Sequence, residues 1–154
     1  MDSIILCLFI LQPMYSDSSE SWNEKVELQM PDRISVCVSV MEEADRQGVP
    51  PNLSAAVAWH ESKFNADAVS KAGAVGPLQI LPRYWCPLKK LKDCDLVVEG
   101  VSALKVYIEK YDNYKKALCH YNSGNKCSNR SKTYARRVLI TFNRLNYIEA
   151  FLFD

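Results

Sequence analysis

A short stretch near the middle of the chain, AWHESKFNADAVSKAGAVGPLQILP, places one carboxylate beside a loop of small residues. The carboxylate is Glu61, which follows His60 at the end of an Ala-rich segment and precedes a loop that contains Gly73, Gly76 and Pro77. Burial in a partly apolar cleft raises the pKa of a carboxyl group, and a Glu with a raised pKa suits general acid catalysis near neutral pH. The alternative is a solvated Glu at a helix end, because most Glu residues are exposed. Residue types and spacing alone leave both interpretations open.

The elements that must position Glu61 are helices, because apolar residues recur at helical spacing and no alternating strand pattern persists. The segments expected to be helical are 32–47, about 51–61, about 95–111, about 114–121 and about 131–150. Residues 64–82, rich in Gly, Ala, Ser and Pro, predict a structured loop. The predicted fold class is therefore all-α, in one compact domain. Glu61 falls in the last turn of its helix, where the helix dipole disfavours a carboxylate.

Length and composition are those of one globular domain. The chain has 154 residues, of which 48% are hydrophobic and 24% charged. The net charge of +1 is unevenly divided: residues 1–82 carry 5 Lys or Arg and 11 Asp or Glu (−6), and residues 83–154 carry 14 and 7 (+7). A basic half can meet an anionic polymer or a membrane surface. No nucleic-acid partner is expected, because no aromatic and basic residues interleave and no binding motif is present.

The N-terminal apolar run, Ile4 to Leu11, has the length of a signal-peptide core and is followed by polar residues. It is too short to cross a bilayer as a helix, which needs about 20 residues, so no stable membrane span is expected. We expect residues 1–29 to be a signal or leader with a polar linker, and residues 30–154 to be the domain. The leader lacks the usual positively charged start. A buried first helix or strand, and a start site assigned upstream of the true domain, are the alternatives.

The six cysteines give information on the cellular compartment that does not depend on the N-terminal run. Four of them form two close pairs, Cys86 with Cys94 and Cys119 with Cys127, which suit disulfides in an oxidising space such as the periplasm or a virion. Neither pair has the spacing that zinc favours, so we expect no metal and no cofactor. Cys37 is expected to be a buried thiol, and Cys7 to leave with the leader.

Three ordered motifs together resemble the soluble lytic transglycosylase family, whose fold is similar to that of goose-type lysozyme. They are Glu61-Ser62 followed by Ser70, then GAVGPLQILP from Gly73, then HYNSG from His120. The resemblance is close from about residue 50 to 124, and it implies a lysozyme-like domain with a loop-bearing active-site cleft. It also implies a peptidoglycan partner, in a secretion or conjugation apparatus or in a virion.

The resemblance assigns roles to five residues of this chain. Glu61 matches the catalytic acid and base, and Ser70 and Tyr121 are expected to hold its carboxyl group. Gln79 matches the Gln of the family's GLMQ element, and Asn122 follows the Tyr of its AYNxG element; both are expected to hydrogen-bond the glycan. All five should line one cleft.

This sequence departs from the family pattern at three positions. Pro77 replaces the Leu of GLMQ, which removes one backbone donor and stiffens the turn. Cys119 and His120 stand where small residues usually precede the Tyr-Asn pair.

The motif supplies one carboxylate, whereas most glycosidases use two. The resemblance therefore implies a lytic transglycosylase that cleaves the MurNAc-GlcNAc β-1,4 bond without water and leaves 1,6-anhydroMurNAc ends. Two alternatives stay open: a hydrolytic goose-type-like muramidase, and a non-catalytic glycan-binding subunit of a secretion apparatus or virion. Asp67 is the only other acid near the motif.

Overall fold

The described part of the chain, residues 3–16 and 23–153 of a computed structural model, is built from helices. In chain order these are α1 (Ser3–Ser16), α2 (Asn23–Gln47), α3 (Pro51–Ser62), α4 (Pro82–Trp85), the 3-10 turn η1 (Leu91–Asp93), α5 (Leu96–Lys110), α6 (Tyr114–Ser123) and α7 (Asn129–Phe153). The described residues contain no strand, only isolated β-bridges that join Val75 to Val69 and to Ile80 in the loop before α4. The predicted all-α fold class is confirmed.

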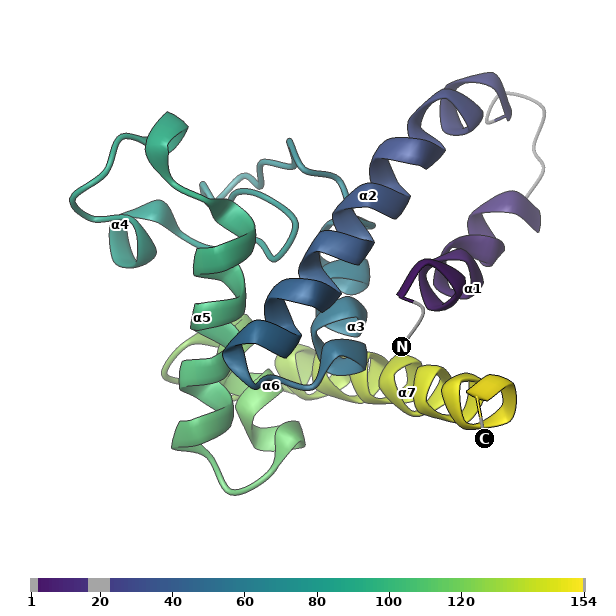
Figure 1. Ribbon diagram of the computed structural model, residues 1–154. Helices are drawn as coiled ribbons and strands as arrows, with labels where there is room; N and C mark the ends of the chain where they lie inside the picture. Colours follow the sequence, from purple (N-terminus) through teal and green to yellow (C-terminus); the bar gives the residue numbers. More distant parts are fainter. Residues whose placement is uncertain (1–2, 17–22, 154) are drawn as a thin grey trace.

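Helix α3, which carries Glu61, lies at the centre of the molecule between α2 and α7 (Figure 1). All its residues from Asn52 to Ala58 are buried, and the alanines among them let the neighbouring helices approach closely. Pro51 begins the helix at a position where its missing N–H costs nothing. The helix ends at Ser62, and the next residue, Lys63, has a left-handed backbone (φ 55°). The chain therefore turns sharply just after Glu61.

Helix α2 is longer than the sequence pattern predicts. We expected it to begin after Pro31, but it begins at Asn23 and has Pro31 in its interior. A proline inside a helix removes one N–H hydrogen bond without necessarily ending the helix. The prediction of this boundary was therefore wrong, whereas the end at Gln47 agrees.

Helix α1 packs into the hydrophobic core. Its side chains Leu6, Cys7, Ile10 and Leu11 are buried, and Cys7 forms a disulfide with Cys37 of α2. The expectation that Cys37 is a free buried thiol is wrong. Sequence reasoning assigned the apolar run to a leader and therefore left Cys37 without a partner. The boundary at residue 29 stays a prediction, and part of its proposed linker, residues 17–22, lies outside the described residues.

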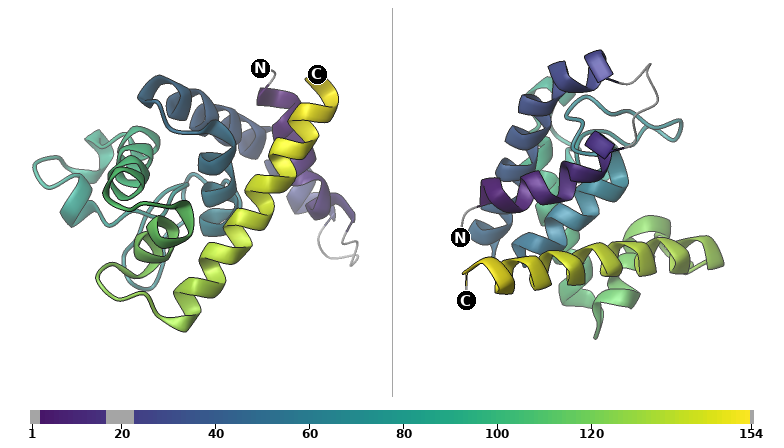
Figure 2. Two further views of the ribbon diagram at one scale, coloured as in Figure 1. Left: turned by 90° about the horizontal axis from the view of Figure 1, so that it is seen from below. Right: turned by 90° about the vertical axis from the view of Figure 1, so that its right-hand side faces the viewer.

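Helices α5, α6 and α7 complete the chain, and the first two are capped at their N-termini by side chains. The side chain of Asp95 caps α5 by accepting hydrogen bonds from the backbone N–H groups of Val97 and Val98, both at 3.1 Å. Asn113 caps α6 in the same way through the N–H of Lys116, at 2.9 Å. Figure 2 shows α7 as a straight helix along one edge of the molecule, with α1 beside its C-terminal half.

None of the described helices is both long enough and apolar enough to cross a membrane.

Candidate active site

Glu61 lines a cleft of about 730 Å³. Its walls come from the end of α3, the loop before α4, α4 itself, the middle of α5, the end of α6 and the start of α7. All five residues singled out by the sequence line it: Glu61, Ser70, Gln79, Tyr121 and Asn122. Residues up to 61 positions apart in the chain thus meet in one place, as the motif order predicts.

Glu61 is the only carboxylate among the described residues that line this cleft. Burial raises the pKa of its carboxyl group to about 7, and a hydrogen bond from Tyr134 opposes part of that rise. Near neutral pH the carboxyl group is therefore divided between its protonated and ionised forms. Such a group can both give and take a proton.

The hydrogen bond to Glu61 comes from Tyr134 of α7, a residue to which the sequence analysis assigned no role. The Tyr134 hydroxyl donates to Oε1 of Glu61 at 2.6 Å. Burial and the neighbouring Glu61 raise the pKa of Tyr134 well above its usual value, so the hydroxyl keeps its proton. The sequence offered one signal for this contact: a Tyr on the buried side of a helix usually finds a hydrogen-bond partner for its O–H group.

Ser70 and Gln79 hold the loop rather than the carboxyl group of Glu61. Oγ of Ser70 accepts a hydrogen bond from the backbone N–H of Ala74 at 3.0 Å. Nε2 of Gln79 donates to the carbonyl oxygens of Ala68 at 3.0 Å and Gly76 at 2.9 Å. The amide nitrogen of Gln79 is therefore engaged inside the loop, and its Oε1 is the atom left to face a ligand.

Tyr121 also has a partner other than Glu61. Its hydroxyl donates to the carbonyl oxygen of Leu78 at 2.6 Å, which ties the end of α6 to the loop before α4. Burial raises the pKa of Tyr121 well above its usual value, and the charges of Glu61 and Tyr107 raise it further. We expected Ser70 and Tyr121 to hold the carboxyl group of Glu61. Instead, Tyr134 donates the hydrogen bond to that group, and Tyr121 joins α6 to the loop before α4.

Pro77 fits the turn that carries Gln79. The backbone N–H of Gln79 donates to the carbonyl of Gly76 at 3.1 Å, so Pro77 is the second residue of a four-residue turn. Proline is favoured there because its fixed φ matches the turn. The carbonyl of Pro77 accepts a hydrogen bond from Oγ of Ser62 at 2.8 Å, which joins this turn to the end of α3. The departure from the family motif therefore leaves the loop well supported.

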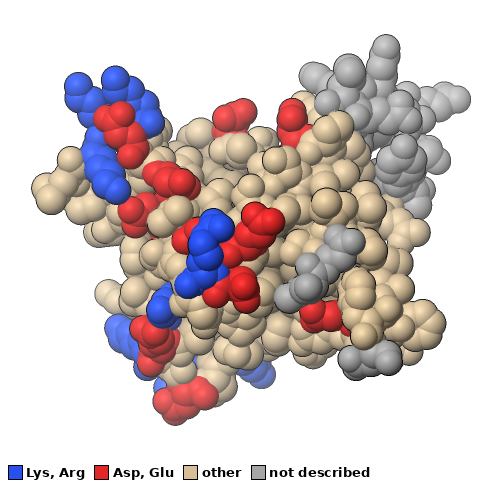
Figure 3. Space-filling model, viewed as in Figure 1, with Lys and Arg blue, Asp and Glu red and all other residues tan. Residues whose placement is uncertain are grey.

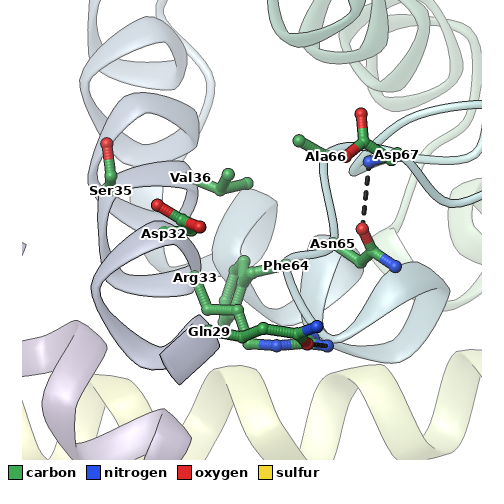
Figure 4. Close-up of a pocket in the computed structure, with 9 residues that line it drawn as sticks. All are labelled: Gln29, Asp32, Arg33, Ser35, Val36, Phe64, Asn65, Ala66 and Asp67. Atoms are coloured by element: carbon green, nitrogen blue, oxygen red, sulfur yellow. Dashed lines mark hydrogen bonds between the residues drawn. The ribbon is translucent and has the colours of Figure 1, made fainter. Parts of the chain in front are cut away.

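Asp67, the other acid close in sequence, lies in a different place. It lines a separate pocket of about 380 Å³ together with Asp32 and Arg33 of α2 (Figure 4). The guanidinium of Arg33 donates to the carbonyl oxygen of Lys63 at 2.5 Å, and the backbone N–H of Asp67 donates to Oδ1 of Asn65 at 3.0 Å. Asp67 is thus not among the residues of the cleft that holds Glu61.

His60, adjacent to Glu61, contacts α7 instead of the cleft. Its Nε2 lies 2.8 Å from Oγ1 of Thr141. Burial, together with the nearby cations Lys63 and Arg137, lowers the pKa of His60 to about 4. The imidazole is therefore neutral at pH 7.

Two disulfides lie at the edges of the cleft. Cys86 pairs with Cys94 directly after α4, and Cys119 pairs with Cys127 across the turn between α6 and α7. Both pairings were expected from the sequence. Together with the Cys7–Cys37 bridge they account for all six cysteines and indicate an oxidising compartment.

No cluster of three or more His, Cys, Asp or Glu side chains that could bind a metal ion occurs within residues 3–16 and 23–153.

The comparison with protein families agrees with this geometry. A family model described as "Transglycosylase SLT domain" matches residues 39–141, which is about two thirds of the chain and runs from α2 into α7. The matched region includes every described residue that lines the cleft.

Proposed function

Because the chain belongs to the transglycosylase SLT family, we propose that it is a peptidoglycan lytic transglycosylase. In this proposal it cleaves the MurNAc-GlcNAc β-1,4 bond and leaves 1,6-anhydroMurNAc ends. Glu61 acts first as the acid and then as the base. The observation that carries the proposal is a single carboxylate in the cleft whose pKa is raised to about 7.

The reaction needs one group that changes its role. Protonated Glu61 gives its proton to the glycosidic oxygen, and the bond from C1 of MurNAc to that oxygen breaks. The substrate's own acetamido group stabilises the positive charge at C1. Ionised Glu61 then takes the proton of the MurNAc C6 hydroxyl as its oxygen bonds to C1. No water is consumed, and Glu61 ends protonated as it began.

The surrounding residues support both steps. Burial favours the protonated carboxyl group needed first, and the Tyr134 hydroxyl, 2.6 Å from Oε1, stabilises the carboxylate needed second. In this proposal Oε1 of Gln79 and the side chain of Asn122 hydrogen-bond the glycan, and both residues line the cleft. Hydrolysis by two carboxylates would need a second acid near the substrate. Asp67 lies in the other pocket, which favours the transglycosylase over the muramidase.

The test is mass spectrometry of the products released from purified peptidoglycan by the wild-type protein and by Glu61→Gln. We expect the wild type to release anhydro muropeptides and Glu61→Gln to release none, with an unchanged circular dichroism spectrum. Products heavier by one water would identify a muramidase. A wild-type protein that binds peptidoglycan without cleaving it would instead be the non-catalytic glycan-binding subunit.

The three disulfides support action outside the cytosol, in the periplasm or in a virion. A secretion or conjugation apparatus, or virion components, are the partners proposed for those two settings.

A further inference from the structure

The outward face of α7 combines cations with exposed apolar side chains. Ile140, Tyr147 and Phe151 are exposed at 62%, 74% and 77%. At about 100° per residue they fall, with Arg136 and Arg144, within about 80° of arc. We call this set of five residues the α7 outer face.

No carboxylate lies on the α7 outer face. Helix α7 contains five Lys or Arg residues and one Glu, and that Glu points inward: Oε2 of Glu149 accepts a hydrogen bond from Asn52 of α3 at 2.6 Å. Ion pairs within the described residues involve no cation of α7. Within the described residues, the cations of the face therefore form no ion pair.

Helix stability does not account for this arrangement. Cations stabilise a helix near its C-terminus and destabilise it near its N-terminus. In α7 the cations Arg130 and Lys132 lie in the first turn, and the last turn has none. Burial of the core does not account for the apolar side chains either, because the core side of α7 is formed by Ala135, Val138 and Leu145.

We propose that the α7 outer face binds the surface of an anionic lipid bilayer. A helix that lies in the membrane interface has this composition: aromatic and aliphatic side chains enter the boundary of the acyl chains while cations meet the anionic headgroups. A soluble polyanion would use the cations but offers no place for Tyr147 and Phe151. A second copy is disfavoured, because a two-fold contact through this face would bring like charges together.

The geometry allows such binding without covering the cleft. Tyr134, which reaches Glu61, and the buried residues Ala135 and Val138 lie on the other side of α7. In the face of the molecule shown in Figure 3, many Lys and Arg side chains lie toward α4, α5 and α6. Helix α1, which contacts α7, also carries two exposed apolar side chains, Ile4 at 53% and Leu8 at 50%.

The test is co-sedimentation of the full chain with vesicles of phosphatidylcholine alone or with roughly a third of phosphatidylglycerol. We expect the wild type to partition onto the anionic vesicles at least about tenfold better than onto the neutral ones, and less well in high salt. Arg136→Glu with Arg144→Glu should lower that partitioning by about thirtyfold or more. Tyr147→Ser with Phe151→Ser should lower it by about tenfold.

A matched control reverses the charge of two cations that lie outside the α7 outer face. Lys90→Glu with Lys92→Glu changes the net charge equally, at exposed residues near η1. This variant should bind anionic vesicles nearly as well as the wild type. Circular dichroism confirms that each variant is folded.

Three outcomes would overturn the proposal. They are equal binding to both vesicle types, equal losses in the face and control variants, and concentration-dependent dimers in sedimentation velocity that Phe151→Ser abolishes. Glu61→Gln should bind vesicles like the wild type, because the vesicles contain no glycan. Loss of the enzymatic proposal would therefore leave this one intact, and the reverse also holds.

Discussion

At the scale of single residues, the main question is how Glu61 is kept partly protonated at neutral pH. The sequence pointed to an unfavourable place in the last turn of a helix. The structure gives burial as the main cause of the raised pKa. Either cause would raise the pKa in the folded protein only, so either predicts a free energy of unfolding that depends on pH.

Glu61→Gln should make the protein more stable at high pH. The pKa of Glu61 is about 7 in the folded protein and 4.5 in the reference state, so the folded protein binds the proton more tightly. Its contribution is fully present below pH 4.5 and is lost as the pH rises to about 7. The variant has no such loss. Its free energy of unfolding relative to wild type should rise by on the order of 3 kcal/mol between pH 4.5 and 8.

The measurement is urea unfolding of both proteins across that pH range. The difference between the two proteins cancels the contribution of His60, which titrates in the opposite sense. A difference that stays constant with pH would show that the pKa of Glu61 is not raised in the folded protein.

Tyr134→Phe should shift the pH dependence of activity. The Tyr134 hydroxyl stabilises the carboxylate, so its removal raises the pKa of Glu61 further. The pH at which activity is half lost on the alkaline side should rise by about one unit, because a hydrogen bond to a charged group contributes about 1.5 kcal/mol. The measurement is the pH profile of anhydro product release.

Tyr121→Phe is the matched control for this prediction, because its hydroxyl donates to the Leu78 carbonyl and not to Glu61. Equal shifts in the two variants would show that Tyr134 supports packing alone.

At the scale of elements, the loop between α3 and α4 is positioned by close contact with α5. A Cβ added to Gly100 would lie 2.8 Å from Cβ of Leu78, a fully buried side chain. The backbone of Leu78 in turn receives the hydrogen bond from Tyr121. Gly100 thus lets α5 approach the turn that carries Gln79.

Gly100→Ala should lower both stability and activity. Alanine is a better helix former than glycine by about 1 kcal/mol, yet overpacking against Leu78 costs about 1–3 kcal/mol. The displaced turn should lower the rate of product release about tenfold, because small misplacements of binding groups slow catalysis strongly. Thermal unfolding and anhydro product assays measure the two effects.

Val106→Ala on the exposed side of the same helix is the control, and it should leave stability and activity nearly unchanged. A stabilised and fully active Gly100→Ala protein would mean that Leu78 moves without consequence.

The sequence predicted the helices better than the contacts between them. The residues that meet in the cleft were found because their motifs are local, as with Glu61 and Gln79. Tyr134 was missed because its partner lies 73 residues away and periodicity assigns it only to a buried face. The Cys7–Cys37 bridge was missed because the apolar run around Cys7 has the composition of a leader and of a buried helix alike.

At the scale of the whole molecule, the three disulfides divide into one that joins helices and two that close loops at the cleft. Cys7–Cys37 links α1 to α2, with 30 residues of separation. Cys86–Cys94 and Cys119–Cys127 each close a loop of 8 residues of separation. Their removal should therefore have different consequences for stability and for activity.

Cys119→Ser with Cys127→Ser should lose activity as well as stability. By the chain-entropy model this loop contributes about 2.5 kcal/mol to stability, and it also holds the turn beside Asn122 at the cleft.

Cys7→Ser with Cys37→Ser should lose more stability, about 3.5 kcal/mol, because its loop is longer. It should nevertheless keep kcat/KM within about twofold at a temperature where it stays folded, because neither residue lines the cleft. Urea unfolding and product assays on both variants separate the two effects. Equal losses of activity would mean that the cleft depends on the packing of α1, and that the cleft and the N-terminal helix form one cooperative unit.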